Sequence, residues 1–191
     1  MKIIIAALAC LLFAKVSFAQ KDLLSFDEHN KYIYYQVVDE PGLPADSLHS
    51  RTVYFLKSAY PKSKLKQTAT AISGENRFVV YGGVSILKHE KGEIACQVNV
   101  EFKDQKYRVW LTGFTFTPYQ RDRYGNFVPE QGIDIPLETA TSKLDKKDVD
   151  SYLDEAGAFC KQLGDRLKIY ITKASVLKKE ETTKKVVTDK W

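Results

Sequence analysis

Apolar and polar residues alternate along five stretches of the chain, and this pattern predicts a β-sheet. Residues 31–38 are rich in Tyr, Ile and Val, which suit a pleated surface. Residues 94–102 alternate most regularly, which is typical of a strand with one face in water. The remaining predicted strands cover 65–73, 77–87 and 107–117. Because turn residues divide the last four strands at hairpin spacing, they are expected to form an antiparallel meander.

Two segments have apolar residues at helical spacing instead. Over 45–59, Leu48, Phe55 and Leu56 fall on one face of the predicted helix. The second predicted helix begins near Asp145 and continues to about residue 170. Residues 118–143, which contain three prolines and two glycines, are expected to be a long loop. This order predicts an α+β fold in two layers, with both helices on one face of an antiparallel sheet.

The N-terminus carries the features of a cleavable signal peptide over residues 1–19. Lys2 precedes an unbroken apolar run, 3–14, which is shorter than the about 20 residues that span a bilayer. Ser17 and Ala19 then provide small residues before a cut near Ala19. We therefore expect an exported protein of the periplasm or cell surface that does not span the membrane. It consists of a single domain, 20–173, and a charged, disordered tail, 174–191.

Removal of the signal peptide changes the net charge of the chain and the number of its cysteines. The formal net charge of the whole chain is +5, and it falls to +3 once Lys2 and Lys15 leave with the signal peptide. A nearly neutral body argues against a nucleic-acid partner. Of the three cysteines, Cys96 and Cys160 remain. In an oxidising compartment they form one disulfide or stay as two buried thiols, and the sequence leaves both alternatives open.

No pattern of catalytic, metal-binding or nucleotide-binding residues stands out. The three histidines stand alone in the sequence, and the cysteines form no C-x-x-C pair. The sequence therefore predicts no metal, no cofactor and no enzymatic activity. Two alternatives remain, a purely structural envelope protein and an enzyme whose site is assembled from distant residues. The nearest candidates for such a site are Arg121, Asp122, Arg123, Tyr124 and His89.

Large aromatic residues fall on both sides of two predicted strands. If the helices cover one face of the sheet, a second set of aromatic residues is left on the other, and such a patch usually marks an interaction surface. The candidate ligand or partner face consists of Tyr32, Tyr34, Trp110, Phe114 and Phe116. Alternatively, the long loop folds back as a lid and buries this face. The candidate lid residues are Tyr119, Arg121, Arg123, Tyr124 and Phe127.

Three motifs resemble a known family, the exported proteins with domain of unknown function 4468, which are common in Bacteroidetes. The motifs are Tyr35-Gln36-Val37-Val38, the Gly42-Leu43-Pro44 break before a helix with Arg51, Phe55 and Leu56, and the 100–108 hairpin leading into Gly113-Phe114. The resemblance covers roughly residues 26–170 and departs at Gln105, where a glycine is expected. It implies a TBP-like fold in the order strand, helix, four strands, helix, and it implies no activity.

A TBP-like fold does not by itself imply DNA binding. We expect a non-enzymatic binding or interaction module of the cell envelope. The ligand alternatives are a small hydrophobic molecule, a sugar or a peptide. Another envelope protein is an equal alternative, because a sheet with free edges can add a strand from a partner.

Overall fold

The computed structural model describes residues 23–82 and 89–181, with side chains up to residue 173. The predicted signal peptide and its cleavage site lie outside the described residues. The helices are α2 (Ala45–Ala59), the 3-10 helix η3 (Leu137–Ser142) and α3 (Lys146–Glu181). The strands are β1 (Ser25–Phe26), β2 (Tyr32–Asp39), β3 (Leu65–Gln67), β4 (Ala71–Gly82), β5 (His89–Lys103), β6 (Lys106–Arg121), β7 (Phe127–Pro129) and β8 (Ile135–Pro136). In the described part, no helix is long and apolar enough to cross a membrane.

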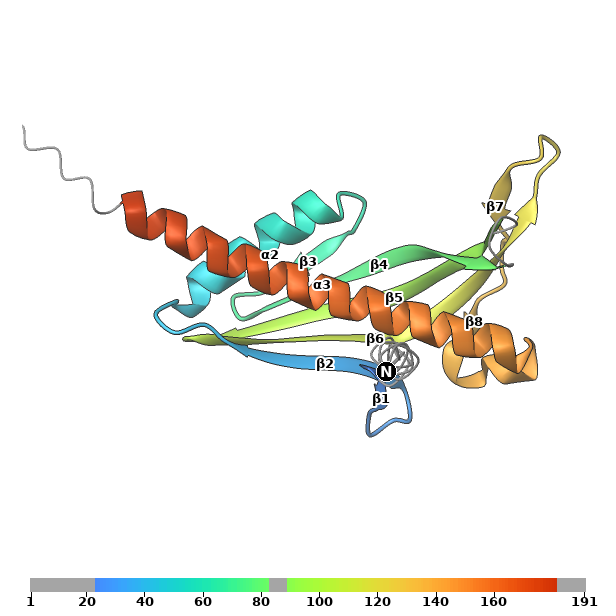
Figure 1. Cartoon of the computed structure of the whole chain (residues 1–191), viewed down its shortest axis with the longest axis horizontal. Helices are drawn as coiled ribbons and strands as arrows, with labels where there is room; N and C mark the ends of the chain where they lie inside the picture. Colours follow the sequence, from blue (N-terminus) through green and yellow to red (C-terminus); the bar gives the residue numbers. More distant parts are fainter. Residues whose placement is uncertain (1–22, 83–88, 182–191) are drawn as a thin grey trace, which may run out of the picture.

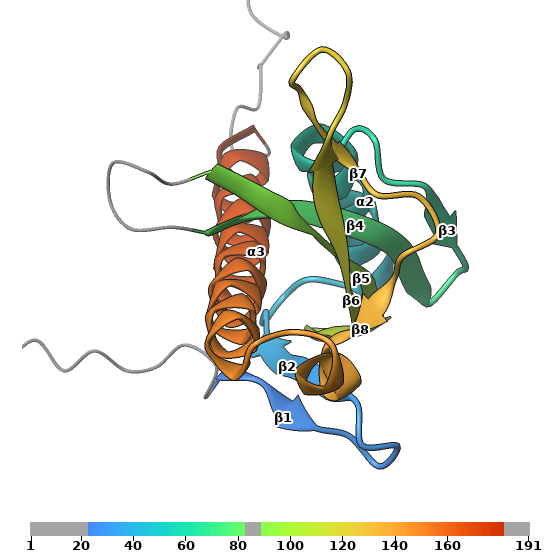
Figure 2. The ribbon, with the colours of Figure 1, turned by 90° about the vertical axis from the view of Figure 1, so that its right-hand side faces the viewer.

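The strands form an antiparallel sheet in the order β1-β2-β6-β5-β4-β3, and β7 and β8 both pair with β6. Helices α2 and α3 pack on the same side of this sheet (Figures 1 and 2). The predicted α+β arrangement in two layers is thus confirmed. The predicted limits of α2 agree with the structure, whereas α3 continues past the predicted end of the domain to Glu181. We call the side of the sheet turned away from α2 and α3 the open face.

The hydrophobic core lies between the sheet and the two helices. The ring of Phe78 on β4 stacks on that of Phe159 on α3, with 4.3 Å between centroids. Gly164 lets α3 approach β2 closely, because a Cβ there would lie 2.5 Å from Gln36 Oε1. Cys96 and Cys160 are buried in this layer as free thiols, and burial raises the pKa of Cys96 to about 12.

A β-bulge in β6 changes which side chains enter the core. From Tyr107 to Leu111 the odd-numbered residues are buried. Gly113 and Phe114 together then lie opposite the single residue Cys96 of β5, and Gly113 has a φ of 67°. An extra residue in a strand shifts the alternation by one position. Beyond the bulge it is therefore the even-numbered Phe114 and Phe116 that enter the core.

Candidate functional site

The open face presents two neighbouring rows of side chains across the strands. In the first row, Tyr35 of β2 pairs with Trp110 of β6, which pairs with Asn99 of β5. In the second row, Val37, Arg108 and Glu101 pair in the same way. Tyr35 and Val37 are each 53% exposed. We call Tyr35, Val37, Glu101, Arg108 and Trp110 the open-face cluster.

Arg108 is held at the centre of this cluster by three neighbours. Its Nε donates a 2.8 Å hydrogen bond to Glu101 Oε2, and its guanidinium carbon lies 5.1 Å from the centre of the Trp110 ring. Hydrogen bonds with Glu101 and with Tyr35 raise the pKa of Arg108. The guanidinium is thus oriented before any ligand arrives, and its charge is already balanced by a carboxylate.

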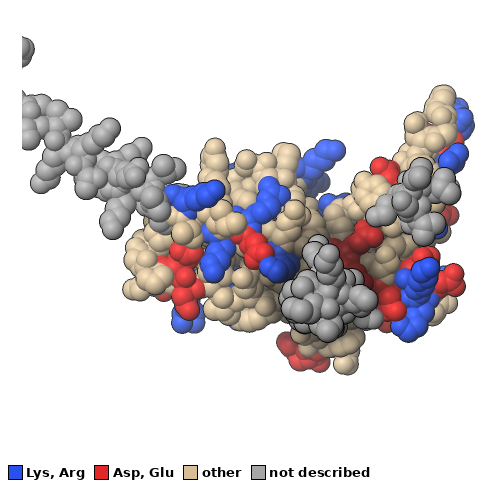
Figure 3. Space-filling model, viewed as in Figure 1, with Lys and Arg blue, Asp and Glu red and all other residues tan. Residues whose placement is uncertain are grey.

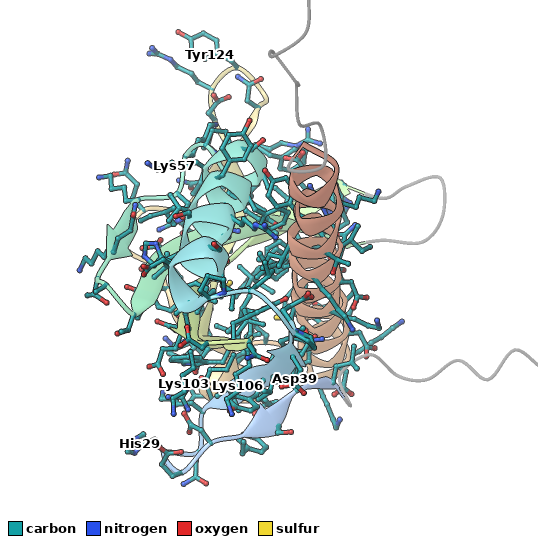
Figure 4. All side chains as sticks on the ribbon, turned by 90° about the vertical axis from the view of Figure 1, so that its left-hand side faces the viewer. His29, Asp39, Lys57, Lys103, Lys106 and Tyr124 are labelled. Carbon is teal, nitrogen blue, oxygen red and sulfur yellow. The ribbon has the colours of Figure 1, made fainter. Side chains whose placement is uncertain are left out.

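A shallow cavity of about 500 Å³ lies beside the cluster, at the end of the sheet formed by the β5–β6 turn. Its lining includes Tyr35, Val37, Glu101 and Arg108 from the cluster, together with Lys103 and Lys106. Figure 4 shows the two lysines close together at this end of the sheet. The cavity thus combines apolar side chains with a rim of two lysines and the paired charges of Arg108 and Glu101. In the described ranges no group of three or more His, Cys, Asp or Glu side chains is arranged to hold a metal ion.

The comparisons with known proteins agree with the α+β fold described above. A family model described as "Domain of unknown function (DUF4468) with TBP-like fold" matches residues 34–117. The fold is TBP-like. The matched segment contains the whole open-face cluster and the bulge at Gly113.

Two crystal structures share this TBP-like fold. The first is a TBP-like protein from Parabacteroides distasonis ATCC 8503, with a TM-score of 0.60 and 11% identity over 78% of this chain and 96% of that one. The second is a DUF4468 family protein from Bacteroides ovatus ATCC 8483, with a TM-score of 0.58 and 13% identity over 78% of this chain and 90% of that one. At these identities the likeness shows the fold alone. No curated protein matches the chain in sequence.

The TBP-like sheet places the predicted ligand-face residues on two different sides. Trp110 lies on the open face, but the prediction is wrong for Phe114 and Phe116, which the bulge turns into the core. It is also wrong for Tyr34, which is only 8% exposed and lies beside α3. Tyr32 lies on the same side as Tyr34, and its ring packs 4.5 Å from that of Phe26.

The members of the cluster that the sequence did not predict are Tyr35, Val37, Glu101 and Arg108. Strand β2 carries large apolar side chains on both sides, so alternation alone does not tell which side meets the helices. One signal was available in the sequence. A glycine inside a strand pattern, here Gly113, indicates a bulge and hence a change of side.

The lid hypothesis is wrong, because residues 118–143 do not fold over the open face. Strand β6 continues to Arg121 and turns into β7, and this hairpin projects from the body of the molecule (Figures 1 and 2). Further along, Ile135 of β8 lies opposite Phe116 and is buried in the core. The segment therefore lies beside Phe116 within the sheet and leaves Tyr35 exposed.

The predicted lid residues lie along the projecting hairpin instead. Tyr119 donates a 3.0 Å hydrogen bond to Glu93, and burial together with this bond raises its pKa to about 12. Tyr124 is 73% exposed at the tip, far from the open-face cavity (Figure 4). The remaining members form stacked pairs, Arg121 with Phe127 at 5.0 Å and Arg123 with Tyr124 at 4.8 Å.

The candidates for a distant-residue enzyme site partly come together at this hairpin. The His89 ring lies 6.0 Å from that of Phe127, next to Arg121. Asp122 is engaged within the turn, where its Oδ1 accepts 2.8 Å hydrogen bonds from the backbone N–H groups of Tyr124 and Asn126. Desolvation raises the pKa of Asp122, but the hydrogen bonds from the turn together outweigh it and hold the pKa below its ordinary value. The carboxylate thus stabilises the turn.

Proposed function

We propose that the chain is a non-enzymatic binding module of the cell envelope, exported by its N-terminal signal peptide, that binds its ligand at the open-face cluster. The observation that carries this proposal is the half-exposed pair Tyr35 and Val37 beside a pre-oriented Arg108. Aromatic and arginine side chains dominate the binding energy of many interfaces. The adjoining cavity, of about 500 Å³, is large enough for an amino-acid side chain or a small apolar group.

The distribution of charge supports a polypeptide or a small apolar molecule as the ligand, in preference to a nucleic acid. Positive and negative side chains are mixed over the side shown in Figure 3, and no continuous basic surface covers it. On the open face, Arg108 is paired with Glu101 and Arg77 with Glu75 and Glu93. Nucleic-acid binding depends on lysines and arginines that are available to phosphates.

A dye-binding experiment tests the role of the cluster. The chain beginning at Gln20 is titrated with 1-anilinonaphthalene-8-sulfonate while backbone NMR shifts report where the dye binds. The double variant Tyr35→Ser/Val37→Ser removes apolar surface from the cluster, and we expect it to weaken dye binding at least fivefold. Tyr124→Ser is the matched control, because Tyr124 is more exposed but lies at the hairpin tip.

The control should bind the dye like the wild type, within a factor of two. Dye shifts centred on Tyr35, Arg108 and Trp110 support the proposal. Equal binding by the double variant and the wild type, with both chains folded by circular dichroism, would remove the cluster as the binding site.

A further inference from the structure

The outer edge of β4 is only partly covered by a neighbouring strand. Strand β3 pairs with residues 72–74 of β4, near its beginning, and β4 then continues to Gly82 (Figure 1). Beyond Gly74, no described strand pairs with this edge. Unpaired edges of this kind offer backbone N–H and C=O groups to other chains.

Two side chains protect the next part of the edge. The odd-numbered residues of β4 direct their backbone groups outward, as the bond from Thr68 N to Ala71 O shows. Ser63 Oγ donates a 2.6 Å hydrogen bond to Glu75 O, and Asn76 Oδ1 accepts a 2.8 Å hydrogen bond from Arg77 N. The next outward residue is Val79, whose N–H and C=O receive no such partner within the described ranges.

A groove runs beside this part of the edge on the helix side. It measures about 520 Å³ and lies between β4 and α3. Its lining consists of Phe78, Val79 and Tyr81 of β4 and of Glu155, Ala158, Phe159 and Gln162 of α3. The stacked rings of Phe78 and Phe159 supply an apolar wall. Open hydrogen-bonding groups and an apolar groove thus lie side by side.

We propose that this edge binds an extended, apolar segment of another polypeptide, which adds to the sheet as a strand. Outward backbone groups select a strand over a helix or a small molecule, because only an extended chain matches their spacing. Alternate side chains of the added strand would enter the groove beside Phe159, and the others would lie next to Val79 on the open face. This site is separate from the open-face cluster and does not depend on it.

The lining of the groove narrows the chemistry of the partner. Five of its seven residues are apolar or aromatic, namely Phe78, Val79, Tyr81, Ala158 and Phe159. The groove therefore favours a segment whose inward side chains are apolar over one whose inward side chains are charged.

The test uses the chain beginning at Gln20 and a capped nine-residue peptide that alternates valine with threonine and has a central lysine. We expect saturating peptide to slow hydrogen exchange of the Val79 amide at least tenfold. Val79→Pro removes the outward N–H without touching the bonds to β5, and should weaken peptide binding at least tenfold. Val79→Thr keeps the N–H and should bind within threefold of the wild type.

Changes to the peptide test the same contact without altering the protein. Methylation of alternate peptide nitrogens removes the donors of one edge, and should abolish binding if it blocks the edge that faces β4. A peptide methylated on the opposite set should still bind. Replacing the valines that enter the groove by serine should weaken binding severalfold. These experiments with altered peptides remain informative even if the Val79→Pro variant does not fold.

Several outcomes would overturn the proposal. They are the absence of Val79 protection at millimolar peptide, equal binding of both methylated peptides, and a wild-type dimer that pairs through this edge and excludes the peptide. Peptide binding that is lost in Tyr35→Ser/Val37→Ser and kept in Val79→Pro would place the peptide on the open-face cluster. That result would support the proposed function while rejecting strand addition.

Discussion

Gln105, in the turn between β5 and β6, has a backbone conformation that favours glycine. Its φ is 64°, and a non-glycine residue in this left-handed region costs about 1–2 kcal/mol. Glycine removes that cost but adds about 0.5–1 kcal/mol of conformational entropy to the unfolded chain. We therefore expect Gln105→Gly to raise the free energy of unfolding by about 0.5–1 kcal/mol, measured by urea denaturation.

Gln105→Ala is the control, because it keeps a Cβ at the same φ. Its free energy of unfolding should equal that of the wild type within about 0.5 kcal/mol. An equal gain in both variants would assign the effect to the glutamine side chain. Gln105 is the residue at which the sequence departs from the family that it resembles. Its positive φ gives a physical reason for the glycine that the resemblance leads us to expect there.

Gly113 has a similar backbone requirement, with a larger consequence for the core. Its φ is 67°, and no atom lies within 4 Å of a Cβ built there. The cost of Gly113→Ala is therefore conformational, and we expect it to lower the free energy of unfolding by about 1–2 kcal/mol. Gly113→Asn should lose less, because asparagine tolerates this conformation better. Equal losses in urea denaturation for both variants would argue against the bulge geometry.

The layers and both long helices were predictable, whereas some strand limits and the sides of the strands were not. The predicted break at 74–76 lies inside β4, and the predicted loop 118–143 contains β7, β8 and η3. The pattern over 45–59 predicted α2 with its observed limits, because Leu48, Phe55 and Leu56 repeat at helical spacing and are all buried. In β6 the alternation predicted one strand correctly but placed Phe114 on the wrong side. A single inserted residue reverses every later position, and a pattern of period two does not reveal where the insertion lies.

The hairpin between β6 and β7 can be shortened to test what it covers. Replacing residues 121–127 by Asn-Gly keeps Gln120 opposite Val128 and closes the strands with a favourable two-residue turn. Because the hairpin points away from the open face, we expect unchanged dye binding and a stability change below about 1 kcal/mol. Increased dye fluorescence with shifts at Trp110 would restore the lid hypothesis.

At the scale of the whole molecule, α2 and α3 cover one side of the sheet, and neither of them covers the side chains of the open face. The sequence predicted this layering because two amphipathic helices accompany one antiparallel sheet. Which side chains are exposed depends instead on contacts between distant segments, such as Tyr34 against Gly164. Among the described residues, whether a strand pairs with the outer edge at Val79 likewise depends on where β3 ends, which only the structure shows.

Burial of the two cysteines makes the stability of the whole molecule depend on pH. Burial raises the pKa of Cys96 to about 12 and also raises the pKa of Cys160. In the unfolded chain a cysteine thiol has a pKa of about 8.5. Above that pH the unfolded chain loses protons that the folded chain keeps. The free energy of unfolding should therefore fall as the pH rises, by up to about 1.4 kcal/mol per pH unit for each thiol.

Urea denaturation between pH 7.5 and 9 measures this slope, because an unfolded tyrosine has a pKa of about 10 and stays mostly protonated in that range. Cys96→Ala and Cys160→Ala should each reduce it by about half. Both thiols of the wild type should resist iodoacetamide while folded and react once unfolded in denaturant without reductant, because a thiol reacts as the thiolate. If the exported chain instead forms the disulfide, no thiol reacts in denaturant and the wild-type slope disappears. The same measurement thus decides between the two alternatives that export leaves open for this pair.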